Sequence, residues 1–164
     1  MRSLELRSYS PQQTQLLGNR LGELAQQSDI VLLTGELGTG KTCLVQGIAR
    51  GLGVEEYAFS PSFVIVREYH GRLPLYHMDL YRLQNTSEIA DLGLEEYLCH
   101  DGISVIEWAE KALEVLPRDR LLIALSYVPG YETQRAISLI SEGRRYSELV
   151  RQLQSVLNGG QSWS

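Results

Sequence analysis

Residues Gly35-Glu36-Leu37-Gly38-Thr39-Gly40-Lys41-Thr42 match the pattern G-x-x-x-x-G-K-[ST] at every fixed position. In such a phosphate-binding loop, Gly35 and Gly40 permit backbone angles that a side chain would forbid. The loop can then curl so that successive backbone N–H groups point inward at phosphate oxygens. Lys41 adds a positive charge for the β- and γ-phosphates, and the hydroxyl of Thr42 is an oxygen ligand suited to Mg²⁺. The stretch therefore predicts a site for a nucleoside triphosphate and its magnesium ion.

The segments on either side of this loop are those that phosphate binding requires. The continuous apolar run at residues 30–33 is typical of a strand buried on both faces. After the loop, apolar residues recur at helical spacing, so we expect a helix that begins near Lys41 and is ended by Gly51 and Gly53. A helix N-terminus favours an anion through its dipole and its free N–H groups. This placement disfavours the alternative of a glycine-rich turn without a ligand.

Composition and charge limit what the rest of the chain can do. The 164 residues suit a single domain, which we expect to span residues 1–157 before a polar tail at 158–164. The net charge of −5 argues against a broad nucleic-acid footprint, which needs clustered Lys and Arg. Two cysteines, Cys43 and Cys99, make no disulfide framework, and no stretch approaches 18 apolar residues. We therefore expect a cytoplasmic protein with reduced thiols and no membrane contact.

Hydrophobic periodicity predicts strands and helices that alternate early in the chain, with hairpins later. Ser10-Pro11 is typical of a helix N-cap followed by proline, and Ser147 is expected to cap the last helix, in which Val156 faces inward. Further helices are expected at residues 86–98 and 109–116. Strands are expected at 4–8, 30–33, 63–69, 75–80, 103–106, 121–128 and 136–141, with 63–69 and 75–80 paired as one hairpin and the last two strands as another. This order predicts a three-layer α/β/α fold of the P-loop NTPase class, with a mixed, mainly parallel central sheet and antiparallel hairpins.

Two carboxylates at strand ends are candidates for magnesium binding and catalysis. Glu107 directly follows an apolar strand, as a Walker B acidic residue does, so its carboxylate can hold Mg²⁺ directly or through water. Asp79 shares one face of its strand with His77 and Tyr81, and such a polar face can line a site. The alternatives are a solvated Glu107, and a hydrated outer face on which Asp79 pairs with Arg82.

The segment Ser60-Pro61-Ser62-Phe63 combines proline and hydroxyl residues ahead of a strand. Such a loop can sense the γ-phosphate as a switch segment does, and a plain strand-entry turn is the alternative. Trp108 is interpreted as a gate or stacking group beside the metal site, or as a packing aromatic. His70 and His100 lack metal-ligand spacing and are interpreted as surface or turn residues.

With these motifs in order along the chain, residues 10–127 resemble the bacterial TsaE (YjeE) family of small P-loop ATPases. The resemblance rests on the phosphate-binding loop, on residues 60–63, on His77-Met78-Asp79-Leu80-Tyr81-Arg82-Leu83 and on Val105-Ile106-Glu107-Trp108. The Asp-Leu-Tyr-Arg block followed by Glu-Trp is far more specific to the family than the loop is. Departures from the family pattern stand at Glu36, Ser62 and Ala109, where Asp, Thr and Pro are usual.

This resemblance implies an ATPase that uses ATP and Mg²⁺, and it implies roles for particular positions. Lys41 and the loop backbone would hold the ATP phosphates, while Thr42 and Glu107 would hold Mg²⁺. Asp79 and Trp108 match family residues needed for function, so with Lys41 and Glu107 they form the implied catalytic set. Ser60, Pro61, Ser62 and Phe63 match the loop interpreted as switch I. The positions implied to contact the nucleotide are Thr14, Glu36, Leu37, Gly38, Thr39, Gly40, Lys41, Thr42 and Cys43.

The resemblance also implies protein partners. Such ATPases act with the TsaD–TsaB complex, which transfers the threonylcarbamoyl group to tRNA adenosine, and hydrolysis would reset that complex between cycles. The chain would then contact tRNA only indirectly, in keeping with its acidic charge.

Two alternatives remain open. A small-molecule kinase needs lid arginines to clamp the transferred phosphate, and the basic residues late in the chain lie in no obvious lid insertion: Arg118, Arg120, Arg144 and Arg145. A nucleotide-gated assembly factor with negligible hydrolysis shares every motif with the ATPase. A GTPase is disfavoured because the chain has no N-K-x-D motif for reading guanine.

Overall fold

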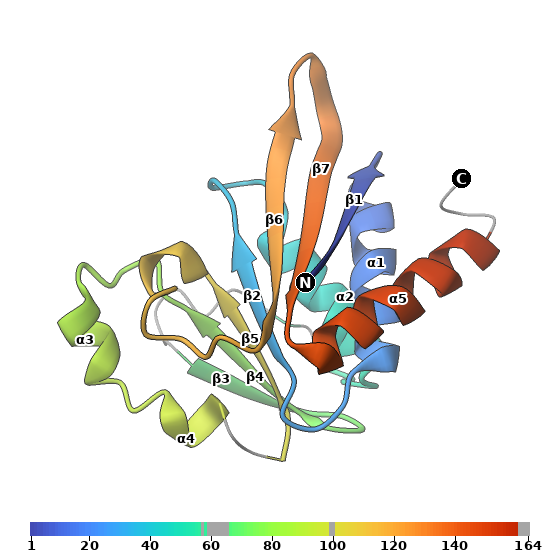
Figure 1. Cartoon of the computed structure of the whole chain (residues 1–164). Helices are drawn as coiled ribbons and strands as arrows, with labels where there is room; N and C mark the ends of the chain where they lie inside the picture. Colours follow the sequence, from blue (N-terminus) through green and yellow to red (C-terminus); the bar gives the residue numbers. More distant parts are fainter. Residues whose placement is uncertain (57, 59–65, 99–100, 161–164) are drawn as a thin grey trace.

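A computed structural model describes residues 1–56, 58, 66–98 and 101–160 of the chain. Its helices pack on one seven-stranded sheet (Figure 1). In chain order the elements are β1 (Arg2–Ser8), α1 (Pro11–Leu24), β2 (Ile30–Thr34), α2 (Lys41–Gly51), β3 (Val66–His70), β4 (Pro74–Asp79), α3 (Thr86–Ala90), α4 (Glu95–Leu98), β5 (Ile103–Glu107), the 3₁₀ helix η1 (Ala109–Lys111), β6 (Arg120–Val128), β7 (Tyr131–Glu142) and α5 (Arg144–Gly159).

The sheet is mixed, with its parallel strands at the centre. The strand order is β1-β7-β6-β2-β5-β4-β3. Strands β6, β2, β5 and β4 run parallel, whereas β3 is antiparallel to β4, and β7 is antiparallel to both β6 and β1. β2 and β5 are buried almost throughout, as expected for parallel strands covered on both faces. The predicted mixed sheet and both predicted hairpins are therefore confirmed.

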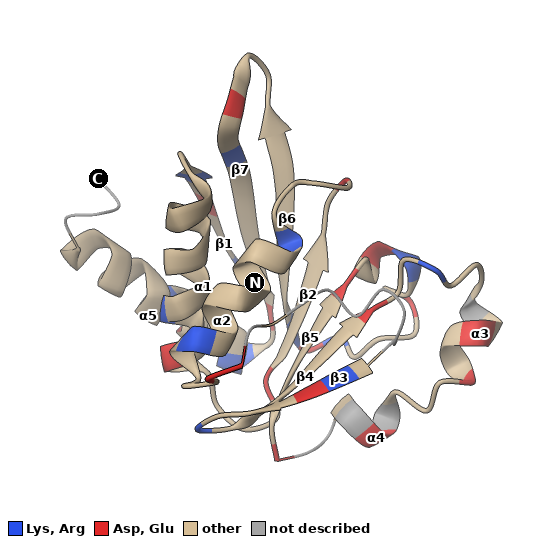
Figure 2. Cartoon of the chain, turned by 180° about the vertical axis from the view of Figure 1, so that it is seen from behind, with Lys and Arg blue, Asp and Glu red and all other residues tan. Residues whose placement is uncertain are grey.

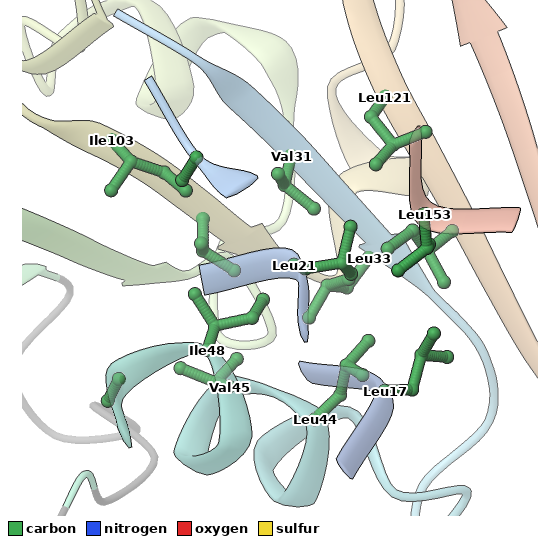
Figure 3. Packing of buried hydrophobic residues seen from close by; sticks show 14 of the residues in the cluster. Leu17, Leu21, Val31, Leu33, Leu44, Val45, Ile48, Ile103, Leu121 and Leu153 are labelled. Atoms are coloured by element: carbon green, nitrogen blue, oxygen red, sulfur yellow. The ribbon is translucent and has the colours of Figure 1, made fainter. Parts of the chain in front are cut away.

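Helices cover both faces of the sheet, which confirms the three-layer α/β/α arrangement. On one face, α1, α2 and α5 pack over the larger hydrophobic cluster. Figure 3 shows apolar side chains of α1 and α2 meeting those of β2 in this cluster, among them Leu17, Leu21, Val31, Leu33, Leu44 and Ile48. On the other face, α3, α4 and η1 contribute Ile89, Leu98 and Ala109 to a smaller cluster over β4 and β5.

Glycines let α1 and α2 cross with their backbones in contact. Gly18 and Gly22 stand one turn apart on α1, and Gly47 and Gly51 stand one turn apart on α2. A Cβ atom added at Gly47 would lie 2.1 Å from the carbonyl oxygen of Gln15, so no larger residue fits without moving a helix. Because α2 starts at the phosphate-binding loop, this close crossing sets the position of the loop relative to α1.

The predicted ends of the first two helices agree with the structure. Ser10 caps α1 by accepting a hydrogen bond from the N–H of Gln13, and proline follows it. Helix α2 begins at Lys41 and ends at Gly51, and Gly53 takes a left-handed φ of +78°.

Two predicted helices on the sheet face covered by α3, α4 and η1 are shorter in the structure. The expected helix at 86–98 is divided into α3 and α4, because Gly93 between them takes a left-handed φ of +64°. The expected helix at 109–116 reduces to the 3₁₀ helix η1, which ends where Ala112 leaves helical geometry with a φ of −140°. The helical spacing of apolar residues had predicted one continuous helix in each segment, and this prediction is wrong.

The start of the last helix also differs from the prediction. Helix α5 begins at Arg144, after Gly143 with a φ of +101°, so Ser147 lies inside the helix and does not cap it. The Ser147 hydroxyl is instead 3.0 Å from that of Ser141 on β7. Val156 is 39% exposed, because the buried stripe of α5 runs through other positions: Tyr146, Leu149, Val150, Leu153 and Leu157.

The outer surface carries charge of both signs. Figure 2 shows acidic residues on α3 and α4, and basic residues distributed over several elements. In the described part of the chain, no helix is both long enough and apolar enough to cross a membrane. Helix α5 continues to Gly159, two residues beyond the expected end of the domain.

Candidate functional site

The loop between β2 and α2 is curled by three glycines. Gly35, Gly38 and Gly40 have φ values of +142°, +81° and +104°, in the region that residues with side chains rarely adopt. Gly35 also lies against β6, where a Cβ atom would stand 2.4 Å from the carbonyl oxygen of Leu125. The glycines of the motif therefore serve both the curl of the loop and its contact with the neighbouring strand.

Lys41 lies folded into this loop. Its ammonium donates hydrogen bonds to the carbonyl oxygens of Gly35 and Glu36, the latter at 2.9 Å. It also lies 4.0 Å from the centre of the Trp108 ring, a cation–π contact. Only 5% of Lys41 is exposed. The charge is thus held at the loop by groups that phosphate oxygens can replace.

The charges around Lys41 oppose each other. Burial lowers the pKa of the Lys41 ammonium from its ordinary value, because a buried charge loses hydration. The carboxylates of Glu110, Glu107 and Asp79 act in the opposite direction and raise that pKa. Lys41 is therefore a desolvated cation among acidic groups, an environment that favours strong interaction with a bound polyphosphate.

Glu107 connects the loop helix to the neighbouring strand. It ends β5, is 2% exposed, and accepts a hydrogen bond from the hydroxyl of Thr42 at 3.0 Å. Its other carboxylate oxygen lies 2.5 Å from Nε2 of His77. The alternative of a solvated strand end is wrong, because the carboxylate is buried and bonded on both oxygens. The two residues implied as magnesium ligands, Thr42 and Glu107, thus stand side by side.

His77 was not among the predicted site residues. It lies on β4, its side chain is fully buried, and its Nδ1 has no hydrogen-bond partner among the described residues. A hydrogen bond from Nε2–H to the Glu107 carboxylate assigns the proton to Nε2. The alternation of the sequence placed His77 on the same strand face as Asp79, and this was the signal that could have identified His77 as a site residue. It did not indicate that His77 contacts Glu107.

His77→Leu is expected to lower the free energy of unfolding by roughly 1–3 kcal/mol, because the buried Glu107 carboxylate loses its donor. For a chain of this size, each kcal/mol corresponds to a fall of about 2–4 °C in the melting temperature. Thermal unfolding measures this loss. His77→Gln is the matched control, since its amide can keep an N–H near the Nε2 position. Equal melting temperatures for His77→Leu and the wild type would show that the bond contributes nothing.

Asp79 lies beside Glu107 at the same edge of the sheet. In the parallel pairing of β4 with β5, Asp79 is opposite Glu107, and the backbone N–H of Leu80 donates to the Glu107 carbonyl at 3.1 Å. Asp79 is 6% exposed, and its Oδ1 accepts from the N–H of Tyr81 at 2.8 Å. The hydrated-face alternative is therefore wrong. Asp79 lines the same cleft as Lys41, Thr42 and Glu107, and β4 is the strand next to that of Glu107.

Trp108 has an unusual backbone conformation. Its φ of +58° and ψ of +37° are left-handed, which costs a bulky residue roughly 1–2 kcal/mol. In this conformation its ring stacks on Lys41 and lies 4.9 Å from the ring of Tyr81. Because Trp108 directly follows Glu107, the turn aims the carboxylate and the indole at the same space. Both proposed roles, stacking and packing, agree with these contacts.

These groups line one cleft of about 530 Å³. Of the residues named from sequence, it contains Leu37, Gly38, Gly40, Lys41, Thr42, Cys43, Asp79, Glu107 and Trp108. Tyr81 and Arg82 line the same cleft. The sequence placed Tyr81 on the polar face that could line a site, whereas Arg82 was expected only as an alternative partner of Asp79. Ser60, Pro61, Ser62 and Phe63 lie outside the described residues, as does His100.

Comparison with known proteins identifies the family. The family model described as threonylcarbamoyl adenosine biosynthesis protein TsaE matches residues 8–137. The chain belongs to the TsaE family. A Bacillus subtilis tRNA threonylcarbamoyladenosine biosynthesis protein TsaE is 39% identical over 93% of this chain and 95% of its own length. The Treponema pallidum protein of the same name is 43% identical over 72% of this chain and 87% of its own length.

A solved structure supports the same conclusion. Bacillus subtilis YdiB superposes with a TM-score of 0.82 at 34% identity, covering 94% of this chain and 95% of that one. The α/β fold and the TsaE family membership are therefore established, and the family is one of nucleotide-binding P-loop proteins.

Three predicted nucleotide contacts of this TsaE chain, Thr14, Glu36 and Thr39, are not among the residues that line the cleft. Thr14 is 2% exposed, and its hydroxyl lies 2.7 Å from that of Ser8. Thr39 is fully buried and donates its hydroxyl hydrogen to the Glu36 carbonyl at 2.8 Å. Thr14 nevertheless lies close to the loop, since a Cβ atom added at Gly40 would be 3.9 Å from its methyl group. Thr14 and Thr39 therefore pack beside or within the phosphate-binding loop and do not line the cleft.

Cys43 lines the cleft as a neutral thiol. Burial raises its pKa, while Arg50 acts to lower it. Its Sγ lies 3.3 Å from the carbonyl oxygen of Pro11, and it is a free cysteine. Cys99 lies outside the described residues. These features indicate a packing contact between α2 and the start of α1, without nucleophilic character.

The oxygen groups of Thr42 and Glu107 fit a magnesium ion. Mg²⁺ prefers oxygen ligands and is commonly bound by one or two protein groups together with phosphates and water. Within the described ranges, no cluster of three or more His, Cys, Asp or Glu side chains could hold a metal by itself. A magnesium ion at this TsaE site would therefore depend on the nucleotide for most of its ligands.

Proposed function

We propose that this chain is a Mg²⁺-dependent ATPase that serves the threonylcarbamoyladenosine modification of tRNA. The observation that carries the proposal is the contact between the Thr42 hydroxyl and the Glu107 carboxylate at 3.0 Å, at the end of a curled phosphate-binding loop. A P-loop threonine and a Walker B carboxylate together hold the metal in P-loop NTPases. The family and the relatives named above support the link to tRNA modification.

The residues in and beside the cleft that carry this proposal have separate tasks. The loop N–H groups bind the phosphates, and Lys41 exchanges its carbonyl partners for phosphate oxygens. A bound Mg²⁺ supplies positive charge against the β- and γ-phosphates. Asp79 orients the attacking water, and His77 holds Glu107 in place through its 2.5 Å contact. Trp108 covers the Lys41 side chain and limits its access to water.

The proposed partner is the TsaD–TsaB complex, and the proposed location is the cytoplasm. Hydrolysis would reset that complex after it transfers the threonylcarbamoyl group, so that tRNA is contacted only indirectly. The acidic net charge of −5 supports docking on a protein more than gripping of RNA.

The test is ATP hydrolysis by the purified chain, alone and with purified TsaD–TsaB. Stimulation of at least about fivefold is expected, the lower end of typical coupling between linked sites. The control is the chain with TsaD–TsaB replaced by an unrelated protein at equal concentration. If TsaD–TsaB neither stimulates hydrolysis nor forms a detectable complex with the chain, the proposal that it is the partner is wrong.

The kinase alternative is disfavoured by where its arginines lie. Arg145 is bonded to Asp29 at 2.7 Å, and Arg120 donates to the carbonyl oxygens of Leu113 and Pro117. Neither these two arginines nor Arg118 and Arg144 line the cleft. A phosphate clamp that used Arg120 or Arg145 would require that residue to leave its structural partners.

A further inference from the structure

The hairpin of β6 and β7 extends beyond its neighbours and reaches the phosphate-binding loop. The pairing of β2 with β6 ends at Thr34 opposite Ala124, and that of β1 with β7 ends at Ser8 opposite Arg135. Residues beyond these points form a projecting two-stranded ribbon (Figure 1). The side chain of Tyr127 on this ribbon, and that of Arg135, which is opposite Tyr127 at the base of the ribbon, bind the loop.

Three consecutive loop carbonyls accept hydrogen bonds from these two side chains. The Tyr127 hydroxyl donates to the carbonyl oxygen of Leu37. The Arg135 guanidinium donates from Nε to Thr39 at 3.2 Å and from Nη2 to Gly38 at 3.4 Å. The loop is thus attached to the hairpin along its most curled part.

Arg135 also fixes the hairpin itself. Its Nη1 donates to the carbonyl oxygens of Glu132 at 2.9 Å and Gln134 at 2.7 Å. Its guanidinium lies 4.7 Å from the centre of the Tyr127 ring. One planar group with five N–H donors therefore joins carbonyls of two segments that are distant in sequence. Tyr127 comes so close to the loop that a Cβ atom at Gly38 would lie 2.7 Å from its hydroxyl oxygen.

These bonds set the direction of the loop N–H groups. In a trans peptide, the C=O of one residue and the N–H of the next point in opposite directions, and the described chain has no cis peptide. Holding the carbonyls of Leu37 and Thr39 toward the hairpin therefore turns the N–H groups of Gly38 and Gly40 away from it. The N–H of Thr39 stays within the loop, donating to Glu36 at 3.3 Å.

We propose that Tyr127 and Arg135 are positioning residues that hold the phosphate-binding loop in its anion-binding shape. The proposal rests on the proposed function, because it assumes that the loop binds a polyphosphate. Neither residue needs to touch the nucleotide. Loss of either bond leaves the fold in place, since the hairpin is also held by its ladders, but lets the loop carbonyls turn inward.

The test measures the affinity of Mg²⁺-ATP and of Mg²⁺-pyrophosphate for the variants Tyr127→Phe, Arg135→Gln and Arg135→Lys by calorimetry. Pyrophosphate isolates the loop, because it has no base or sugar. We expect about threefold weaker binding for Tyr127→Phe and about tenfold for Arg135→Gln, with the same loss for both ligands, from hydrogen bonds of ordinary net strength. Arg135→Lys should lose nearly as much, because lysine has no planar fork.

Matched controls use residues of the same type nearby. Tyr131→Phe alters an exposed tyrosine on the same hairpin, and Arg7→Gln alters an exposed arginine on neighbouring β1. Both should bind as the wild type does. Thermal unfolding is measured for every variant. If Arg135→Gln does not fold, Tyr127→Phe carries the test, because it removes one oxygen from a side chain that is 44% exposed.

The outcomes separate the inference from the proposed function. Pyrophosphate affinity equal to the wild type in Tyr127→Phe and in the folded Arg135 variants overturns the inference, even if their melting temperatures fall. That result assigns a structural role alone. A wild-type chain that binds neither ATP nor pyrophosphate overturns the proposed function and the inference together. Weaker binding with an unchanged melting temperature supports the positioning role.

Discussion

Lys41→Ala is expected to weaken ATP binding by about 100-fold, the loss typical of a strong hydrogen bond to a charged group. Lys41 carries the positive charge of the loop, and its ammonium is held there by the carbonyls of Gly35 and Glu36. In the proposed function this charge binds the phosphates. Isothermal calorimetry with Mg²⁺-ATP measures the change. The effect should be much smaller for adenosine, which has no phosphate for the ammonium to contact.

Lys111 provides the matched control, because the chain has only these two lysines. Lys111 donates to the carbonyl oxygens of Tyr81 and Leu83 and lies over the Tyr81 ring, outside the phosphate-binding loop. Lys111→Ala removes the same charge and should leave ATP affinity within about twofold of the wild type. Unchanged ATP affinity in Lys41→Ala would falsify the assignment of the loop as a nucleotide site.

Glu107→Gln is expected to reduce the rate of ATP hydrolysis by at least about 100-fold, as removal of one key electrostatic group typically does. The substitution keeps the shape and lets the amide oxygen accept from Thr42. It removes the negative charge that would bind Mg²⁺, so the ability of Mg²⁺ to strengthen ATP binding should also be lost. Binding measured in EDTA should remain near the wild-type value.

Glu110→Gln is the control for Glu107→Gln. Glu110 is exposed and also acts to raise the pKa of Lys41, but it does not line the cleft. Its replacement should leave both hydrolysis and the effect of Mg²⁺ close to the wild type. Equal losses of ATP affinity in Glu107→Gln with and without Mg²⁺ would assign Glu107 a structural role.

The same variant separates an ATPase from an assembly factor that only binds nucleotide. A cell in which the Glu107→Gln or the Asp79→Asn variant replaces the wild-type protein should lose the tRNA modification if ATP hydrolysis is required for it. Modification at the wild-type level with both variants, combined with intact ATP binding, would show that catalysis is dispensable.

The sequence by itself determined the strand, loop and helix of the phosphate-binding segment, because these depend on residues that are adjacent in the chain. The buried run before Gly35, the glycines, and the start of α2 at Lys41 depend on residues adjacent in the chain, so their pattern predicted strand, loop and helix. Glu107 was predicted at the site because it ends a short apolar strand. In an α/β sheet, parallel strands deliver such residues to one edge.

Only the tertiary structure decided which distant residues support that site. His77 became a partner of Glu107 because β4 and β5 pair in one particular register, which no local pattern fixes. Tyr127 reached the loop because β6 extends past the end of β2, and Arg135 reached it because β7 places it opposite Tyr127. The predicted helices at 86–98 and 109–116 were too long for a related reason. Apolar spacing indicates which face of a helix is buried, but it does not indicate where the helix ends, as at Gly93 and Ala112. Side-chain pattern specifies which residues are buried, whereas register and close packing specify what each buried group meets.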